Sequence, residues 1–280
     1  GRPGRHRRER IERQEAVLGR HADVLMPPMA NAAVIRVAGL GKSYETAAGL
    51  FPALKGVDLD VRPGEFIAIM GESGSGKTTL LNILATLEKP SSGEVVLEGK
   101  KISTIKEQQL AEFRRDHLGF VFQDFNLLDT LSVRDNIFLP LVLGRYKYGE
   151  MAKRLKALAP KLNIEDLLNK QPFELSGGQK QRVAVARALI TNPKLILADE
   201  PTAALDSKNS DGLLELFEQI NNEGQTILMV THSSLAASHA SRVLFIKDGQ
   251  IFHQLYRAGK SNNEFNRDIT TAITSLLGGE

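Results

Sequence analysis

The chain has 280 residues, of which 42% are hydrophobic and 25% charged, a composition typical of an ordinary globular protein. It has no cysteine, which excludes disulfides, thiolate zinc sites and a cysteine nucleophile. No apolar run approaches the roughly 18 residues that a spanning helix needs, so we expect no membrane-spanning helix.

Basic residues concentrate at the N-terminal end. Residues 1–30 hold seven arginines against four acidic residues, a net charge of +3 that equals the charge of the whole chain, so residues 31–280 sum to zero. The pI of 9.0 therefore belongs to the tail and gives no reason to expect a nucleic-acid partner. We expect residues 1–28 to be a disordered basic tail that need not be native, with Met29 a natural start. The alternative is a basic arm for anionic lipid.

Strand patterns begin just after this tail. Residues 34–37 favour a strand, and a turn-rich segment follows as far as Pro52. Residues 57–61 alternate apolar and polar side chains, which predicts a half-buried strand. Residues 62–65 form a turn through their Pro-Gly pair. Residues 66–70 are a continuous apolar run, typical of a strand buried on both faces.

Strands and helices then alternate along the chain. We expect a strand pair in 91–102, strands at 195–198, 226–230 and 243–246, and helices at 79–87, 106–117, 150–170, 179–190 and 210–221. The alternation predicts a mainly parallel sheet with helices on both faces. Near the C-terminus, Phe265, Ile269, Ile273 and Leu276 form one helical stripe, ended by Gly278-Gly279, which favours packing against the core or a dimer partner.

A phosphate-binding loop follows the buried strand at 66–70. Its residues Gly71-Glu72-Ser73-Gly74-Ser75-Gly76-Lys77-Thr78 match G-x-x-x-x-G-K-[ST] in full, and a helical run begins at Thr79. The glycines let successive backbone N–H groups point at a phosphate, and the helix adds its positive end. We expect Lys77 to bridge the β- and γ-phosphates and the Thr78 hydroxyl to ligate Mg²⁺. A glycine-rich turn with an incidental lysine is the alternative.

Two adjacent acids, Asp199 and Glu200, end the predicted strand at 195–198. Parallel sheets place ligands at the carboxyl ends of their strands, so Asp199 is a candidate for the Mg²⁺ shell. Glu200 is the better candidate for polarising the attacking water, because it lies one residue further into the cleft. Without the phosphate loop, such a pair would be no more than a solvated turn.

A second glycine-rich segment, Leu175-Ser176-Gly177-Gly178-Gln179, opens another helical run. Ser176 is suited to cap this helix, and Gly177 and Gly178 permit close backbone approach to an anion. Together with the two motifs above, the pentapeptide resembles the signature of ATP-binding-cassette (ABC) ATPases. In that family it caps ATP held by a partner subunit, so the resemblance implies an ATP-dependent homodimer.

The resemblance covers residues 33 to about 256 and implies an α/β fold. That fold is a RecA-like P-loop NTPase core with an antiparallel β subdomain and an inserted helical subdomain, at about 123–178. Residues 33–256 would form the ATPase domain and 257–280 a C-terminal helical extension. ATP and Mg²⁺ are the implied cofactors.

Four further positions match single-residue motifs of the family. Tyr44 corresponds to the aromatic that stacks on adenine, and Gln123 to the glutamine loop, which senses Mg²⁺ and contacts the membrane partner. Asp206 corresponds to the loop that crosses the dimer interface, and His232 to the switch histidine that contacts the γ-phosphate. Tyr44 is the weakest match, because a lone tyrosine is more often a packing residue. The other histidines are not spaced in the sequence as metal ligands are, and we assign them no role.

Two segments, residues 113–141 and 252–257, resemble the macrolide-export and lipoprotein-release branch, and within it the bacitracin-type resistance transporters. That likeness implies a separate permease partner with a large extracellular domain and, often, a sensor histidine kinase as a further partner. It also implies that this chain lies on the inner face of the bacterial plasma membrane. Ala203-Ala204 departs from the Gly-Asn that close relatives commonly carry there, which puts the subfamily in doubt but not ATP hydrolysis.

We therefore predict an Mg²⁺-dependent ATPase subunit of a peptide-resistance ABC transporter, with the helical segment around 123–170 gripping the permease. A lipoprotein-release or macrolide-export ATPase is the first alternative. A regulatory ATPase like the cell-division relatives is another. A non-transport ABC protein acting on DNA or ribosomes fits less well, because such proteins usually carry paired cassettes or long coiled-coil insertions.

Overall fold

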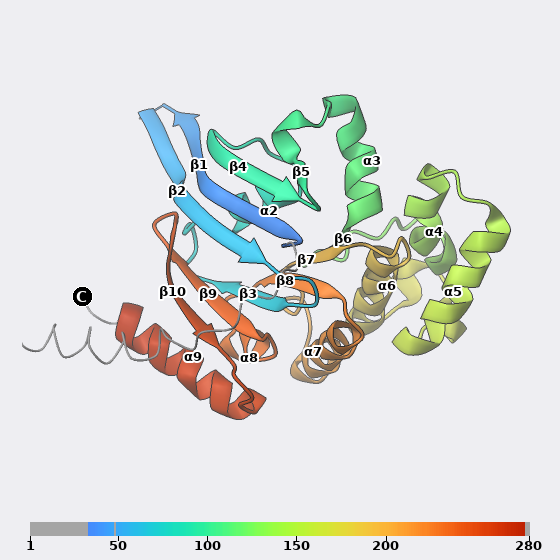
Figure 1. The fold of residues 1–280 in the computed structure, drawn as a ribbon. Helices are drawn as coiled ribbons and strands as arrows, with labels where there is room; N and C mark the ends of the chain where they lie inside the picture. Colours follow the sequence, from blue (N-terminus) through green and yellow to red (C-terminus); the bar gives the residue numbers. More distant parts are fainter. Residues whose placement is uncertain (1–32, 48, 278–280) are drawn as a thin grey trace, which may run out of the picture. The chain divides into compact units, whose positions relative to one another are not determined.

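The computed structural model describes residues 33–47 and 49–277, and the expected tail at 1–28, Met29 and Gly278-Gly279 lie outside this range. The described chain forms two sheets with helices around them (Figure 1). One sheet has four strands in the order β2-β1-β4-β5, and the other has six in the order β10-β9-β3-β8-β7-β6. No helix in the described ranges is both long and apolar enough to span a bilayer.

The six-stranded sheet is the mainly parallel sheet that the sequence predicted. Five parallel strands are joined at one edge by a single antiparallel strand, β10, which the sequence did not indicate. The strands are β6 (Leu118–Val121), β7 (Leu195–Asp199), β3 (Phe66–Met70), β8 (Thr226–Val230), β9 (Arg242–Lys247) and β10 (Gln250–Tyr256). Every residue of β3 and β8 is buried, because helices or a second sheet cover both faces.

Alternate residues of the parallel strands supply two separate hydrophobic cores. In β3, Ile67 and Ile69 pack with helix α2 (Lys77–Leu84) and the antiparallel sheet. Phe66, Ala68 and Met70 point to the opposite face and pack with the remaining large helices. Those helices are α4 (Val133–Leu143), α5 (Tyr148–Leu162), α6 (Gly177–Leu189), α7 (Ser207–Asn222) and α9 (Asn262–Leu277), with the short α8 (Ser234–Ala237).

The antiparallel sheet corrects one sequence prediction. The segment up to Pro52, expected to be turn-rich, is instead a long hairpin of β1 (Ile35–Thr46) and β2 (Gly49–Val61). Register shifts in β1 accommodate its glycines and serines. Its proline lies on β2, an edge strand, where a missing backbone N–H donor is tolerated. Residues 57–61 alternate between buried and exposed, as predicted. The strands β4 (Ser92–Leu97) and β5 (Lys100–Lys101) complete the sheet, followed by α3 (Glu107–His117).

Several helix ends differ from the prediction, including the start of α7, which lies three residues before the predicted residue 210. The helix expected at 150–170 ends at Leu162, because Asn163 adopts a left-handed conformation (φ 52°) that terminates it, and Leu167 lies in a separate 3₁₀ turn. Helix α4, which has Ser132 as its N-cap, was not predicted as a separate helix. The helix after the phosphate loop ends at Leu84, three residues earlier than expected.

The C-terminal stripe packs into the chain's own core. Phe265 and Ile269 of α9 are fully buried there, and Ile273 packs against the same cluster, while the side chain of Leu276 lies outside the description. This is the first of the two roles expected for the stripe.

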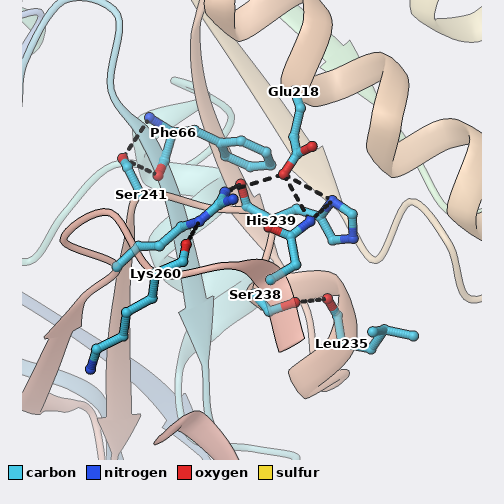
Figure 2. Close-up of polar contacts among 9 residues, drawn as sticks. Phe66, Glu218, Leu235, Ser238, His239, Ser241 and Lys260 are labelled. Carbon is cyan, nitrogen blue, oxygen red and sulfur yellow. Dashed lines mark hydrogen bonds and ion pairs between the residues drawn. The ribbon is translucent and has the colours of Figure 1, made fainter. Parts of the chain in front are cut away.

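A polar cluster fastens the start of α9 to the rest of the fold, as Figure 2 shows. The Glu218 carboxylate on α7 accepts hydrogen bonds from Arg257 Nη1 at 3.2 Å and Asn262 Nδ2 at 3.1 Å. His239 Nδ1 lies 3.2 Å from the same oxygen. Beside this cluster, the Ser241 hydroxyl donates to the Phe66 carbonyl at 2.8 Å. The segment before α9 is therefore tied to α7, and the turn before β9 is tied to the central strand β3.

Candidate active site

The phosphate-binding loop connects β3 to α2, so the strand-loop-helix context predicted for it is confirmed. Gly74 and Gly76 have φ of 80° and 105°, a conformation that favours glycine. A Cβ at Gly76 would lie 2.6 Å from the Ala53 carbonyl oxygen, and one at Gly71 would lie 2.2 Å from the Ile246 carbonyl oxygen. The loop is thus a cradle lined by backbone atoms, and side chains at these two glycine positions would fill it.

Lys77 folds back over this loop. Its Nζ donates to the carbonyl oxygens of Gly71 and Glu72, both at 2.7 Å. Burial lowers the pKa of Lys77, while the negative charges of Glu200 and Asp199 act in the opposite direction. The ammonium therefore lies between the loop and the acidic pair, where it can meet an anion held by the loop.

A buried hydroxyl inside the loop has no partner. Ser75 Oγ is buried and makes no hydrogen bond within the described residues, whereas buried polar atoms are nearly always paired. The loop therefore has an unused polar group as well as an inward-facing lysine. Both suit the binding of a phosphate.

The acidic pair lies at the carboxyl end of β7, as predicted. Asp199 is half-buried, and its pKa is raised by burial and by the neighbouring Glu200, partly offset by Lys77. Glu200 has φ of 45°, an uncommon left-handed conformation for a residue with a side chain. Its N–H donates to the Val230 carbonyl at 2.9 Å, which links the strand end to β8.

Glu200 and His232 hold one another. His232 Nδ1 lies 3.0 Å from Glu200 Oε1, and the backbone N–H of His232 donates to Glu200 Oε2 at 3.3 Å. The Glu200 side chain is largely covered, with 17% exposed, while that of His232 is 72% exposed. The structure therefore brings together Lys77, Asp199, Glu200 and His232, four of the residues that the sequence singled out.

Gln123 is exposed in the turn that follows β6. Because Val121 of β6 pairs with Ala198 of β7, this turn emerges at the same sheet edge as Asp199. Thr78 is also exposed, at the start of α2. The hydroxyl of Thr78 and the amide of Gln123 are accordingly free to meet a ligand near this edge.

Two residues of α6 hold the neighbouring loops, and sequence reasoning missed both. Arg187 donates to the carbonyl oxygens of Phe125 at 2.9 Å and Asn126 at 2.6 Å, and burial lowers its pKa. Gln181, fully buried, donates to the carbonyl of Pro201 at 2.7 Å and more weakly to that of Phe122 at 3.4 Å. The sequence offered one sign of this role, which is that Gln181 falls on the apolar face of the predicted helix, where a buried polar group needs a hydrogen-bond partner.

The second glycine-rich segment starts α6. Ser176 caps the helix as predicted, accepting from Gln179 N at 3.2 Å, while Gln179 Oε1 accepts from Ser176 N at 2.9 Å. A Cβ at Gly178 would lie 2.2 Å from Asn209 Oδ1, so packing against α7 is an unforeseen reason for this glycine. At Gly177 a Cβ would meet nothing closer than Leu205, at 3.6 Å.

The two glycine-rich segments stay separate in one chain. Within residues 33–47 and 49–277, no hydrogen bond or ion pair joins 175–179 to 71–79. Asp206 caps α7, accepting from Asn209 N at 2.9 Å and Asn209 Nδ2 at 2.7 Å, and its neighbour Leu205 would lie 3.6 Å from a Cβ at Gly177. These hydrogen bonds lower the pKa of Asp206. Tyr44 lies on β1, with its hydroxyl 3.3 Å from Thr79 Oγ1 on α2.

Comparison with known proteins identifies this arrangement. Residues 54–203 match the family model described as ABC transporter, which is more than half of the chain. The chain belongs to the ABC transporter family. It is the ATP-binding subunit of a transporter, and in this family ATPase activity is coupled to transport.

Three relatives of this ABC subunit carry the comparison further. The bacitracin export ATP-binding protein BceA of Halalkalibacterium halodurans is 48% identical over 88% of this chain and 98% of its own length. The macrolide export ATP-binding/permease protein MacB of Wolinella succinogenes is 40% identical over 87% of this chain but only 38% of its own length. The cassette MJ0796, in a dimeric post-hydrolysis state bound to ADP and Pi, is 40% identical, with a TM-score of 0.72 over 79% of this chain and 98% of that one.

These comparisons confirm the family and the fold class predicted from the sequence. A RecA-like P-loop core, an antiparallel β sheet and an inserted group of helices are the architecture of ABC cassettes. The branch suspected from residues 113–141 and 252–257 is confirmed as well, since both BceA and MacB are among the relatives.

Proposed function

We propose that this chain is an Mg²⁺-dependent ATPase that pairs with a second copy and powers a separate permease, in resistance to a bacitracin-like peptide. The observation that carries the ATPase assignment is the group of Lys77, Asp199, Glu200 and His232 at one end of the parallel sheet. Nucleotide phosphates held by the adjoining loop would lie against all four.

Phosphate binding would use groups that the loop already presents. The Lys77 ammonium, which now donates to two loop carbonyls, would instead donate to the β- and γ-phosphates. Backbone N–H groups of residues 71–79, with the positive end of α2, would hold the remaining phosphate oxygens. The unpaired Ser75 hydroxyl adds one more donor inside the cradle.

The residues around this cradle also fit a magnesium ion. Thr78, Gln123 and Asp199 offer a hydroxyl, an amide and a carboxylate oxygen, the hard ligands that Mg²⁺ accepts alongside phosphate oxygens. When bound, Mg²⁺ would neutralise charge on the β- and γ-phosphates. Burial and the charge of Glu200 raise the pKa of Asp199, Lys77 offsets part of that rise, and a bound cation would favour the ionised carboxylate further.

Water attack on the γ-phosphate would depend on Glu200 and His232. The Glu200 carboxylate is fixed by two contacts to His232 and by its own backbone bond to Val230, so it can orient and polarise a water without reorganising. His232, exposed at the mouth of the site, would contact the γ-phosphate itself. ATP would therefore bring these two residues and Lys77 onto one phosphate group.

The site would be completed by a partner's signature. In this chain residues 175–179 are not bonded to its own phosphate loop, and the dimeric cassette MJ0796 shows that a 40% identical protein pairs. We propose that Ser176, Gly177, Gly178 and Gln179 of one copy cap ATP on the other, and that the Asp206 loop crosses the interface. Binding would close the pair and hydrolysis would reopen it.

Relatives support a substrate class and a membrane partner. The 48% identity to BceA over nearly its whole length favours peptide resistance, and the 40% identity to MacB favours macrolide export as a second candidate. We propose a permease docked around residues 123–170, at the inner face of a bacterial plasma membrane, and a sensor histidine kinase acting through that permease. Residues 33–256 would form the ATPase domain, 123–178 its helical subdomain and 257–280 an extension.

Susceptibility of a bacterial host tests this assignment. The chain would be expressed with the permease encoded beside its gene, and growth measured against bacitracin and, separately, a macrolide. We expect resistance to bacitracin alone, lost when Lys77→Ala removes the phosphate contact. Resistance to the macrolide alone would favour the second candidate, and resistance that persists with Lys77→Ala would contradict an ATP-driven role.

A further inference from the structure

The hydroxyl of Tyr44 is held by two groups. It donates to Glu88 Oε2 at 2.6 Å and lies 3.3 Å from Thr79 Oγ1. The tyrosine is on β1 of the antiparallel sheet, while Thr79 is on α2, two residues after Lys77. Glu88 follows the end of α2, and its backbone N–H donates to the Asn82 carbonyl at 3.2 Å.

Glu88 is itself fixed in place. Asn82 Nδ2 on α2 donates to Glu88 Oε1 at 3.0 Å, and Lys42 Nζ lies 3.5 Å from Glu88 Oε2. Burial alone would raise the pKa of Glu88, but the hydrogen bonds from Tyr44 and Asn82 and the charge of Lys42 outweigh it, so the pKa is lowered. The pKa of Tyr44 is raised by burial and by this carboxylate. At neutral pH the pair is therefore a charged acceptor and a protonated donor.

This contact fixes where the tyrosine ring lies relative to the phosphate loop. Anchoring the hydroxyl holds χ1, which sets the position of the ring, while rotation about χ2 leaves the hydroxyl in place. The anchors Thr79 and Asn82 belong to α2, the helix whose first residue is Lys77. Lys42 Nζ lies over one face of the ring, 5.1 Å from its centre, so a base would have to stack on the opposite face.

We propose that Glu88 is a positioning residue for the adenine of ATP, acting through Tyr44. It holds the ring at a position where a base can stack while the phosphates occupy the loop. This proposal rests on the proposed ATPase function and on the stacking of Tyr44 on adenine that the family resemblance implies, and it extends that contact to a residue outside the nucleotide site. Without Glu88 the ring can swing away from this position, and part of the stacking free energy is lost to ordering it on binding.

Binding of ATP and of inorganic tripolyphosphate, measured by calorimetry on the full chain, tests the proposal. Tripolyphosphate occupies the phosphate loop but has no base. Because the base stacks on the aromatic ring, Tyr44→Ala should weaken the binding of ATP about tenfold. Glu88→Ala should weaken it about threefold to tenfold, the cost of ordering one side chain. Both variants should bind tripolyphosphate as the parent does.

Three further variants separate positioning from a structural role. Glu88→Gln keeps an oxygen that can accept from Tyr44 and should restore most of the ATP affinity. Glu88→Ala should have no added effect once Tyr44→Ala is present. Glu45→Ala, a matched control, removes an exposed carboxylate beside the tyrosine and should change nothing.

The outcomes that overturn the proposal are distinct. If Glu88→Ala weakens ATP and tripolyphosphate equally, or weakens ATP further in the Tyr44→Ala background, Glu88 supports the fold and not the base. If Glu88→Ala binds ATP normally while Tyr44→Ala does not, only the role of Glu88 fails. If Tyr44→Ala itself binds ATP normally, the proposed adenine contact fails and the role of Glu88 with it.

Discussion

Glu200 combines strain with two fixed contacts. A left-handed conformation costs a non-glycine residue about 1–2 kcal/mol, and here the bond to Val230 and the pairing with His232 hold it. Strain of this kind gathers at functional sites, where the surrounding structure determines a side chain's direction. The sequence indicated the carboxylate but gave no sign of the backbone conformation that aims it.

Replacing the Glu200 carboxylate by an amide tests its role in hydrolysis. Glu200→Gln should bind ATP as the parent does, because the phosphate loop is untouched. Its turnover should fall about 100-fold or more, as expected when a general base is lost. Phosphate release and nucleotide binding measure the two effects. Hydrolysis at the parent rate would show that another group polarises the water.

The glycines of the signature should differ in their effect on stability. Gly178→Ala places a Cβ against Asn209, so we expect a loss of about 1–3 kcal/mol in the free energy of unfolding. Gly177→Ala meets no close neighbour and should be neutral or better, since alanine favours helices. Asn209→Ala should relieve the Gly178→Ala defect. Equal losses at both glycines in denaturant unfolding would contradict the packing argument.

At the scale of elements, local patterns predicted more than long-range contacts did. The buried strands β3, β7 and β8 and the cap at Ser176 depend on short sequence patterns, and the structure confirms them. The hairpin of β1 and β2 was missed because its pairing overrides the turn signals of its glycines and proline.

The supporting residues of the site escaped prediction for the same reason. Arg187 acts on a loop about sixty residues before it, Gln181 on loops 20 and 59 residues away, and Glu88 on a strand 44 residues before it. The motif residues were recognisable because a phosphate loop needs its groups at fixed spacing. Contacts that tertiary packing creates have no such spacing.

The polar cluster of Figure 2 makes a prediction about helix α9. Glu218→Ala leaves Arg257 and Asn262 without their shared acceptor, which should cost about 1–3 kcal/mol. In a protein of this size the melting temperature should fall by about 2–9 °C. Glu215→Ala, an exposed carboxylate on the same helix, is the control and should have little effect.

Hydrogen exchange shows whether this loss is local. Amides of α9 should lose protection in Glu218→Ala, while those of β3 and β8 keep theirs. Unchanged protection in α9 would mean that the burial of Phe265 and Ile269 holds the helix by itself.

For the whole molecule, half-buried histidines predict acid sensitivity. Burial lowers the pKa of His117, His239 and His253, although Glu218 and Asp211 oppose the effect at His239, as do Asp116 and Glu98 at His117. A histidine with a lowered folded pKa takes up protons more readily when unfolded, so stability is complete above an unfolded pKa of about 6.5 and is lost as pH falls below it.

Denaturant unfolding as a function of pH measures this dependence. The free energy of unfolding should decline between about pH 7 and about pH 5, above the range in which carboxylates titrate. His253→Gln removes one of the three groups and should flatten the decline. A free energy of unfolding that is constant across this range in the parent would show that the histidines are not buried as neutral groups.

The central claim is that ATP joins two copies of the chain through a shared site. Within the described residues no hydrogen bond joins the phosphate loop to the signature of the same chain, and in the proposed pair the signature of a second copy would cover the nucleotide. In such a pair Ser176 would contact the nucleotide of the partner as well as cap its own helix. The substitution Ser176→Arg would block that nucleotide contact while leaving the phosphate loop of its own chain intact.

Light scattering on the Glu200→Gln variant, with and without ATP, tests this claim most directly. We predict a monomer without ATP and a dimer with it, because hydrolysis no longer reopens the pair. Adding Ser176→Arg should leave a monomer that still binds ATP, whereas the control Ser275→Arg, on the exposed face of α9, should leave the dimer intact. A Glu200→Gln protein that stays monomeric with saturating ATP, or a dimer that survives Ser176→Arg, would contradict the shared site.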